Sequence, residues 1–369
     1  MKFTCDCQSI KQEIEYAINF TSQRNSLSIT SNVLLETAND LLTVKSTDNK
    51  MGFVSSIGVS TAVPGSITVF CDKLLAVLKN MPEGDIEIST EEDKLSIRPI
   101  NSEKSIINVN IKTIPADKFP AMMDISDSSY FTLAQRDFFD MIDKTSFAVS
   151  DEETRHFLTG VYIEKKDGKL VTVATDGRKL ACVRRSFEQE IMDFPPAIVS
   201  VKFLSLLKSI GKGDGVFSLA INSSSIFAKI DNKVIYSNLI SGTYPNYERV
   251  IPSQLKYECR MSKSDMEKAI SLISVLVEAK SKRIFIDLNK EGVLISGENT
   301  DFGDSKQIIK CEYDGPEARI SFNYNLILTP IRKIDSDFIK IAYNTPQAAM
   351  VLLPEPEKDY LYVLMPMQV

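Results

Sequence analysis

The sequence predicts an α+β fold in which one arrangement of helices on antiparallel sheet is built three times along 369 residues. Phe3-Thr4, Phe131-Thr132 and Tyr257-Glu258 each open a short strand followed by an amphipathic helix, at offsets of 128 and 126 residues. A repeat of this length has the size of a whole domain. We therefore expect three domains, at residues 1–122, 123–253 and 254–369.

The first helix of each copy is predicted from apolar residues at helical spacing. In the first copy, residues 8–20, we expect Lys11 and Glu13 on the side opposite the apolar face. The apolar faces are formed, copy by copy, by Ile10, Ile14, Ala17 and Ile18, by Phe138, Phe139, Met141 and Ile142, and by Met266, Ala269, Ile270 and Ile273. Each of these faces needs a sheet on which to pack.

Strands and a second helix complete each copy. In the middle copy, Asp167-Gly168 and Asp176-Gly177 are hairpin signals that separate three strand-like runs. Those runs are residues 160–164, 169–174 and 179–183, and second helices are expected near 73–80, 202–210 and 325–334. Pro330 should shorten or kink the last of these helices. Each copy is then two β-α-β-β-β halves, with helices on one face of the sheet.

Composition indicates an ordinary globular protein, with 43% hydrophobic and 25% charged residues. No apolar run approaches the roughly 18 residues that cross a bilayer, and the start of the chain lacks a signal peptide, so we expect a cytoplasmic protein. The six cysteines are scattered without a repeated spacing and are expected to be reduced and mostly buried. No metal site and no cofactor are expected.

The residues that usually carry catalysis are scarce. His156 is the only histidine, and both the Gly-x-Ser-x-Gly motif and the Gly-rich phosphate loops are absent from the sequence. Acidic clusters at Glu91-Glu92 and at Asp151 to Glu153 could bind magnesium, although solvated loops are the simpler interpretation. They leave open an alternative function, a metal-dependent nucleic-acid phosphotransferase or nuclease. An adhesive or scaffold protein built from repeats is a further alternative.

Basic side chains recur on the predicted helices although the net charge is −6. They are Lys11, Arg24, Lys73, Lys79, Lys144, Lys202, Lys208, Lys212, Lys268 and Arg332, with a further cluster at Lys280, Lys282 and Arg283. Each one alone is most simply a solvated side chain. Together they could favour a polyanion, because a local field and not the net charge decides such binding.

Four separated segments of the sequence form a distinctive set. They are Met1-Lys2-Phe3-Thr4, Val-Ala-Thr-Asp-Gly-Arg-Lys-Leu-Ala at 173–181, Tyr-Pro-Asn-Tyr-Glu-Arg-Val-Ile-Pro at 244–252, and Tyr-Val-Leu-Met-Pro-Met at 362–367. In these segments the chain resembles the bacterial replicative sliding clamp, the beta subunit of DNA polymerase III, and the resemblance extends over its whole length. The resemblance implies three DNA-clamp domains per chain and a ring-shaped head-to-tail homodimer around duplex DNA, with the helices on the inner face. It also implies a non-catalytic processivity factor.

The resemblance, with the helical lysines, assigns candidate residues to three sites. Expected DNA-binding residues are Arg24, Lys73, Lys79, Lys202 and Lys208. The implied dimer contacts join an edge strand of the first domain to the last domain, and the candidates are Val109, Ile111, Val275 and Leu276. A hydrophobic peptide groove that tethers the replicative polymerase, the clamp loader and repair proteins is implied at Leu158, Thr175, Gly177, Arg178, Lys179, Leu180, Pro245, Arg249, Val250, Val363, Met365, Pro366 and Met367.

Three departures from the family pattern concern charge. Asp151 to Glu153 occupy a loop that carries neutral or His side chains in well-known clamps, so this loop should repel phosphate or point away from it. Arg178-Lys179 replaces the commoner His-Arg, and Gln368 stands where an arginine is common. Apart from the resemblance, Met365 and Met367 could simply complete the core of the last domain, or present flexible thioethers to apolar ligands.

Overall fold

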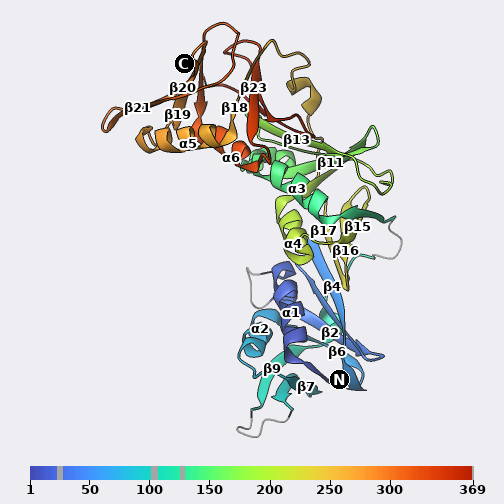
Figure 1. The fold of residues 1–369 in the computed structure, drawn as a ribbon. Coiled ribbons are helices and arrows are strands. Elements are labelled where there is room, and N and C mark those ends of the chain that lie inside the picture. The colour runs from blue at the N-terminus through green and yellow to red at the C-terminus, as the bar shows by residue number, and fades with distance from the viewer. Residues whose placement is uncertain (23–27, 101–106, 125–128, 368–369) are drawn as a thin grey trace. The chain divides into compact units, whose positions relative to one another are not determined.

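The computed structural model describes residues 1–22, 28–100, 107–124 and 129–367 (Figure 1). They form two compact units, one made of Met1–Gln135 with Lys202–Leu239 and the other of Arg136–Val201 with Ile240–Val369. The middle third of the chain therefore contributes to both units. The three domain ranges expected from the sequence stay a prediction.

The first unit begins with two halves of the expected β-α-β-β-β order. The first half consists of β1 (Lys2–Asp6), α1 (Cys7–Ala17), β2 (Asn32–Ala38), β3 (Leu41–Thr47) and β4 (Met51–Gly58). After the short strand β5 (Ser60–Val63), the second half consists of β6 (Gly65–Phe70), α2 (Cys71–Lys79), β7 (Asp85–Glu91), β8 (Lys94–Pro99) and β9 (Val109–Ile114).

The same order continues through the middle third of the chain. One half consists of β10 (Phe131–Ala134), α3 (Gln135–Thr145), β11 (Gly160–Lys166), β12 (Lys169–Thr175) and β13 (Lys179–Arg185). The next consists of β14 (Ala197–Ser200), α4 (Val201–Gly211), β15 (Val216–Ile221), β16 (Ser225–Ile230) and β17 (Lys233–Asn238). The Asp-Gly turns predicted after β11 and after β12 lie where the sequence placed them.

Two further halves complete the chain, so the predicted repetition is confirmed. One consists of β18 (Tyr257–Ser262), α5 (Lys263–Ile273), β19 (Arg283–Asn289), β20 (Gly292–Asn299) and β21 (Gly303–Ile309). The other consists of β22 (Ala318–Asn323), α6 (Tyr324–Lys333), β23 (Phe338–Tyr343), β24 (Met350–Glu355) and β25 (Tyr360–Leu364). α6 continues through Pro330 to Lys333, so Pro330 does not shorten this helix, and the alternative expectation of a kink stays a prediction.

Polar residues cap the start of α1, α5 and α6, whereas α2 follows Phe70, which makes no side-chain cap. The side chains of Asp6 and Ser262 accept hydrogen bonds from backbone N–H groups three residues later, at 2.8 and 3.2 Å. The Asn323 side chain accepts from the Asn325 N–H, two residues later, at 3.0 Å. These contacts satisfy N–H groups that have no partner within the first helical turn.

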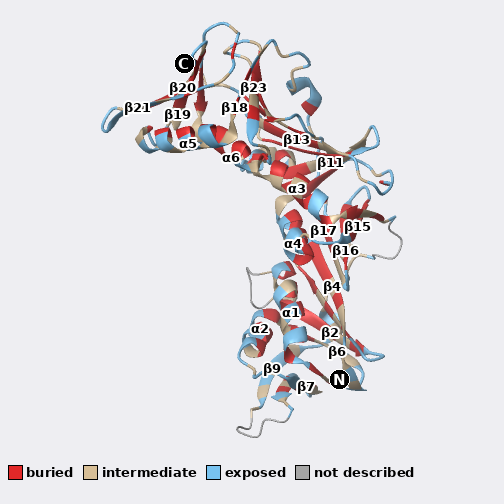
Figure 2. Cartoon of the chain, viewed as in Figure 1, coloured by how far each residue is buried: buried red, intermediate tan, exposed pale blue. Residues whose placement is uncertain are grey.

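The first helix of each copy buries the predicted apolar face, except for Ile18, which follows α1 in a short 3-10 helix and is half-buried. Figure 2 shows buried residues along one side of the helices and exposed residues along the other. Ile10, Ile14 and Ala17 of α1 are buried, but so is Glu13, which the sequence placed on the outer side. The burial of Glu13 is explained by a partner distant in sequence, because the Lys233 ammonium group of β17 lies 3.1 Å from the Glu13 carboxylate. A helical pattern alone contains no sign of that cation.

All the strand pairings that join these halves are antiparallel. A 13-stranded sheet in the first unit has the order β10-β15-β16-β17-β4-β3-β2-β6-β9-β8-β7-β1-β5. In the second unit an eight-stranded sheet has the order β14-β11-β12-β13-β25-β24-β23-β18, and a four-stranded sheet has the order β21-β20-β19-β22. Successive copies are thus joined edge to edge, through the β17–β4 pair and the β13–β25 pair.

The six cysteines are free thiols, as expected. Burial raises the pKa of the Cys5, Cys71 and Cys182 thiols to about 12 in each case. Among the helices of the described residues, none has the length and apolar content needed to cross a membrane.

Candidate functional site

The pairing of β13 with β25 brings two of the predicted groove segments together. Leu180 lies opposite Val363, and both side chains are almost completely buried. Beyond the pair, the Met365 N–H donates to the Arg178 carbonyl at 2.9 Å. Residues about 185 positions apart in the sequence therefore form one continuous strip because two sheets of the repeat are joined edge to edge.

A tight turn fixes the backbone at one end of this strip. The Asp176 carboxylate accepts hydrogen bonds from the N–H groups of Arg178 and Lys179, at 2.8 and 3.0 Å. The Thr175 hydroxyl accepts from the Gly177 N–H at 3.1 Å and donates to the Lys179 carbonyl at 2.6 Å. Gly177 has a φ of +90°, a conformation that favours glycine. The Thr-Asp-Gly sequence is therefore explained by the geometry of the turn.

The segment 244–251 packs against the same apolar cluster. Tyr247, in the short 3-10 helix Tyr247–Val250, is buried against Leu180 and Val363, and Tyr244 and Ile251 contact the same cluster. The cluster is completed by Val171, Val173 and Cys182. Pro245, Arg249 and Val250 are attached to this floor through their buried neighbours, and they are themselves exposed.

The predicted groove residues divide into a buried floor and an exposed rim. Leu158, Thr175, Leu180 and Val363 are buried; Lys179, Pro366 and Met367 are half-buried; Gly177, Arg178, Pro245, Arg249, Val250 and Met365 are exposed. Val250 and Met365 keep 48% and 43% of their surface exposed, which is high for apolar side chains. Met365 therefore does not serve as core, whereas Met367 exchanges hydrogen bonds with Ser321 of β22. We name the thirteen predicted groove residues, floor and rim together, the peptide surface.

Sequence reasoning missed the residues that support this rim. Glu164 of β11 accepts hydrogen bonds from the Tyr247 hydroxyl at 2.6 Å and from the Tyr162 hydroxyl at 3.0 Å. The signal in the sequence was the alternation of Tyr162, Glu164 and Lys166, which puts three polar or aromatic side chains on one face of a strand, together with the two tyrosines of the Tyr-Pro-Asn-Tyr segment as possible partners.

The DNA-binding candidates that the structure describes are exposed on helices of the first unit. Lys73 and Lys79 lie on α2, and Lys202 and Lys208 lie on α4. Three of these lysines form loose ion pairs with carboxylates. Asp72 lies 3.8 Å from Lys73, Glu15 lies 3.5 Å from Lys79, and Asp48 lies 3.8 Å from Lys202. Such exposed pairs are weak, so the ammonium groups of these three lysines remain available to an anion. Arg24 lies outside the described residues.

A polar hollow lies between α1 and α4 in the same unit. Its lining contains Lys11 and hydroxyl and amide groups that can contact phosphate or sugar oxygens. The lining residues are Gln8, Ser9, Lys11, Gln12, Glu15, Tyr16, Asn19 and Ser209.

Lys144 does not belong with the exposed basic side chains among which the sequence placed it. Its side chain is 8% exposed, and its ammonium group contacts Asp140 at 2.8 Å and Asp335 at 2.7 Å. Burial alone would lower the pKa of Lys144, but the hydrogen bonds to Asp140 and Asp335 outweigh it and raise that pKa. The helical pattern was misleading here because only Asp140 lies on the same helix, whereas Asp335 is 191 residues away in the sequence.

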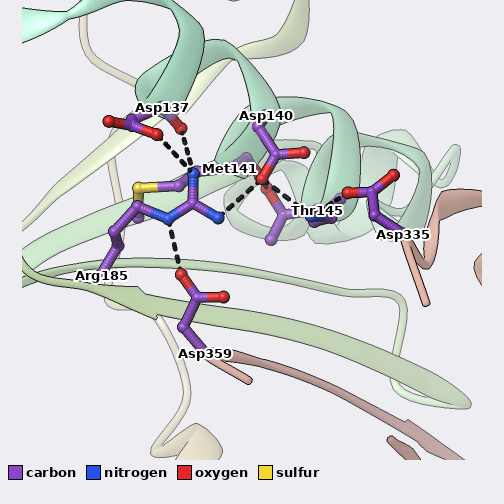
Figure 3. A network of polar contacts seen from close by, with 8 residues as sticks. Asp137, Asp140, Met141, Thr145, Arg185, Asp335 and Asp359 are labelled. Atoms are coloured by element: carbon purple, nitrogen blue, oxygen red, sulfur yellow. Dashed lines mark hydrogen bonds and ion pairs between the residues drawn. The ribbon is translucent and has the colours of Figure 1, made fainter. Parts of the chain in front are cut away.

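Arg185 of β13 extends this cluster of charges, as Figure 3 shows. Its guanidinium contacts Asp140 at 2.7 Å, Asp359 at 2.6 Å and the Asp137 carbonyl at 2.9 Å. One oxygen of Asp140 therefore accepts from both Arg185 and Lys144. The network connects α3 and β13 of the middle third with the last third of the chain.

In the acidic loop, one of the three carboxylates is paired within the same segment. Asp151, Glu152 and Glu153 are exposed, and Glu152 accepts two hydrogen bonds from Arg155, at 2.9 and 3.1 Å. Across the described part of the chain, no three His, Cys, Asp or Glu side chains are grouped as metal ligands would be.

The candidate dimer residues are accessible. Val275 is 76% exposed at the end of α5, and Leu276, Val109 and Ile111 are half-buried. β9 has a neighbouring strand on each side in the sheet, but the two neighbours pair with different parts of it. Val109–Lys112 pair only with β8, and Thr113 and Ile114 pair with β6. Among the described residues, the first part of β9 is therefore paired on one side only. β21, which contacts α5, is an edge strand of its sheet.

Comparison with known proteins matches the whole chain. The models of the N-terminal, central and C-terminal domains of the DNA polymerase III beta subunit match residues 1–123, 132–246 and 248–368. The beta sliding clamp of Treponema pallidum is 32% identical, and that of Escherichia coli is 24% identical, each over the full length of both chains.

Solved structures give the same result. The DNA polymerase III subunit beta of Pseudomonas aeruginosa is similar with a TM-score of 0.92 at 26% identity, covering all of both chains. The beta sliding clamp of Caulobacter crescentus is similar with a TM-score of 0.93 at 26% identity, with the same coverage. The three consecutive domain matches, the repeated fold and the full-length relatives agree, and the chain belongs to the DNA polymerase III beta subunit family, the beta sliding clamps.

Proposed function

We propose that this sliding clamp, a non-catalytic processivity subunit, acts as a head-to-tail homodimeric ring around duplex DNA in the cytoplasm. The observation that carries the proposal is the match of all three clamp domains, in order, to one chain. A closed ring holds DNA by topology, so its contacts with phosphate need only be weak and independent of sequence. Weak contacts also permit sliding.

Lys73, Lys79, Lys202 and Lys208 supply such contacts in this proposal, together with Arg24. The support is their exposure on α2 and α4 and the polar lining of the hollow between α1 and α4. Each lysine is a point charge on a flexible stem, which suits contact with a moving phosphate backbone. The acidic residues Asp151 to Glu153 give no attraction to phosphate.

The peptide surface is the proposed docking site for the replicative polymerase, the clamp loader and repair proteins. Its support is an apolar floor with an exposed apolar rim and a few fixed polar groups, which is the usual composition of a ligand site. A structure of a Pseudomonas aeruginosa sliding clamp contains bound griselimycin, and a Caulobacter crescentus clamp has polyethylene glycol at a region described as a putative beta-motif tethering region.

Retention on nicked circular DNA tests the ring. The clamp is loaded with a matching clamp loader and ATP, the circle is cut once, and the DNA-bound fraction is separated by gel filtration. Retention on circles that is lost after cutting supports topological linkage. Equal retention on circular and linear DNA contradicts it.

The dimer interface is tested by Val275→Asp. A carboxylate in a buried apolar contact is costly, so we expect the variant to sediment as a monomer at concentrations where the parent chain is a dimer. Val216, which is 54% exposed on β15, provides the matched control Val216→Asp. Dimers that persist unchanged in Val275→Asp would remove Val275 from the interface.

A further inference from the structure

One face of β11 lies beneath the segment that carries part of the peptide surface. Tyr162, Glu164 and Lys166 alternate along this strand and so point to the same side of the sheet. Each of them contacts a residue of the segment 244–248, and the contacts follow one another in order along the strand.

The contacts differ in kind from one end of the strand to the other. The Tyr162 ring stacks on Tyr244, with centroids 4.6 Å apart and planes 13° apart. Glu164 accepts the Tyr247 hydroxyl hydrogen bond at 2.6 Å, and Lys166 contacts the Glu248 carboxylate at 2.5 Å. The middle contact is less accessible than the last one, because Tyr247 is 5% exposed whereas the side chains of Lys166 and Glu248 are 40% and 45% exposed.

Glu164 combines two of these contacts in one carboxylate. One oxygen accepts from Tyr247 and the other from Tyr162, so the same group fixes the ring that stacks on Tyr244 and the ring that anchors the 3-10 helix. Hydrogen bonds to a charged acceptor are stronger than those between neutral groups. Burial, followed by the contact with Glu164, raises the pKa of the Tyr247 hydroxyl, which therefore stays protonated as a donor.

We infer that Glu164 is a positioning residue of the peptide surface, which holds Pro245, Arg249 and Val250 against the floor formed by Leu180 and Val363. The inference rests on the peptide-docking function proposed above. Pro245 lies between the two tyrosines, and Arg249 and Val250 follow Tyr247 within one 3-10 helix. Without the carboxylate, the buried Tyr247 hydroxyl would lose its acceptor, and the rim would be less well ordered before a peptide binds.

The test compares peptide affinity with ring function in the full-length clamp. The probe is a short fluorescein-labelled peptide with leucine and phenylalanine anchors, followed by fluorescence anisotropy. The variants are Glu164→Ala, Glu164→Gln and Tyr247→Phe, with Lys165→Ala as the matched control. Lys165 is adjacent in sequence but points to the other face of β11, where it pairs with Asp193 at 2.7 Å.

We expect Glu164→Ala to weaken peptide binding about tenfold, a loss typical of leaving a buried hydroxyl without an acceptor. Glu164→Gln keeps one acceptor oxygen and should recover most of the affinity, and Lys165→Ala should bind as the parent does. Tyr247→Phe should lose affinity, and the double variant with Glu164→Ala should lose no more than Glu164→Ala alone. The clamp loader also docks on the peptide surface in this proposal, so it is added in excess and the half-life of the clamp on nicked circles is followed after loading. That half-life should be unchanged in all of the variants.

Parent-like affinity in both Glu164→Ala and Tyr247→Phe would overturn the positioning role. If Glu164→Ala does not fold, Tyr247→Phe decides alone, since it removes only the hydroxyl group that Glu164 accepts from, and parent-like affinity in this variant would overturn the positioning role. Failure of the parent clamp to bind the peptide would instead contradict the docking function itself, and the two failures are therefore distinguishable.

Discussion

Two sets of cations in this chain have opposite environments, although Lys144 of the second set lies on a predicted helix just as the lysines of the first set do. Lys73, Lys79 and Lys202 of the first unit are exposed on α2 and α4, each with a carboxylate at 3.5 to 3.8 Å. Lys144 and Arg185 of the second unit are largely buried and contact carboxylates at 2.6 to 2.8 Å. The difference teaches that a lysine on a predicted helix is available to DNA only if no acid from elsewhere in the chain has reached it.

The physical reason is the cost of removing a charge from water. A buried ammonium or guanidinium is tolerated only with close, hydrogen-bonded acids, whereas an exposed one keeps its hydration. The first set should therefore contribute to binding and little to stability, and the second set should contribute to stability and little to binding.

The largest effect is expected for Arg185→Ala. The substitution leaves Asp137, Asp140 and Asp359 without their shared cation, and we expect the free energy of unfolding to fall by about 2–3 kcal/mol, less than for a fully buried pair because the acids are partly exposed. Urea unfolding followed by circular dichroism measures this. Arg185→Lys should lose less, since it keeps the charge. A loss below about 0.5 kcal/mol in Arg185→Ala would mean that the network is a surface feature.

Lys144→Gln and Lys73→Gln remove the same charge from the two environments. We expect a stability loss of about 1–2 kcal/mol for Lys144→Gln, because Asp140 keeps Arg185 and Asp335 is mostly exposed. Lys73→Gln should stay within about 0.5 kcal/mol of the parent. Thermal and urea unfolding of both variants under one buffer condition gives the comparison. Equal losses would abolish the distinction between the two sets.

Sequence reasoning succeeded where a pattern is local and repeated. Residue spacing predicts the apolar faces of α1 and α5, and turn chemistry predicts the Asp-Gly turns. The recurrence of these patterns along the chain also predicts the six-fold repetition of the β-α-β-β-β order. It failed at Glu13, Lys144 and Glu164, whose partners are 220, 191 and 83 residues away in Lys233, Asp335 and Tyr247. A buried charge looks the same as a solvated one until the fold supplies its partner.

The peptide surface shows the same limit. Its residues were named from a family resemblance, and no spacing rule would place Leu180 opposite Val363, because the β13–β25 pair joins two copies of the repeat. Local chemistry explains the Thr175 to Lys179 turn but not which strand lies beside it. Long-range pairing is decided by the edges that each copy leaves open.

A smaller effect is expected in the salt dependence of DNA binding. Each phosphate contact that is lost should reduce the slope of log affinity against log salt by about one unit. Lys73→Ala, Lys79→Ala and Lys202→Ala should each lower that slope, and Lys144→Gln should leave it unchanged. Anisotropy of a short labelled duplex over a salt series measures the slope. A reduced slope in Lys144→Gln would place that buried lysine among the DNA contacts after all.

The smallest effect is the pH dependence of the Lys144–Asp335 contact. The hydrogen bond from Lys144 lowers the pKa of Asp335, so its contribution to stability is present above the unfolded pKa of about 3.9 and is lost as pH falls through the lower folded value. The pKa of Lys144 is raised, so its contribution is present below about pH 10.4 and is lost as pH rises through the folded value. Solvent screening keeps both contributions to stability modest, because Asp335 is 67% exposed.

The melting temperature of the parent should therefore exceed that of Asp335→Asn by a constant margin between these limits, and the margin should shrink in acid and in alkali. Thermal melts across pH 3 to 11 would reveal it, and a margin that grows as pH falls below about 4 would contradict the ion pair, since protonated Asp335 has no charge to offer Lys144.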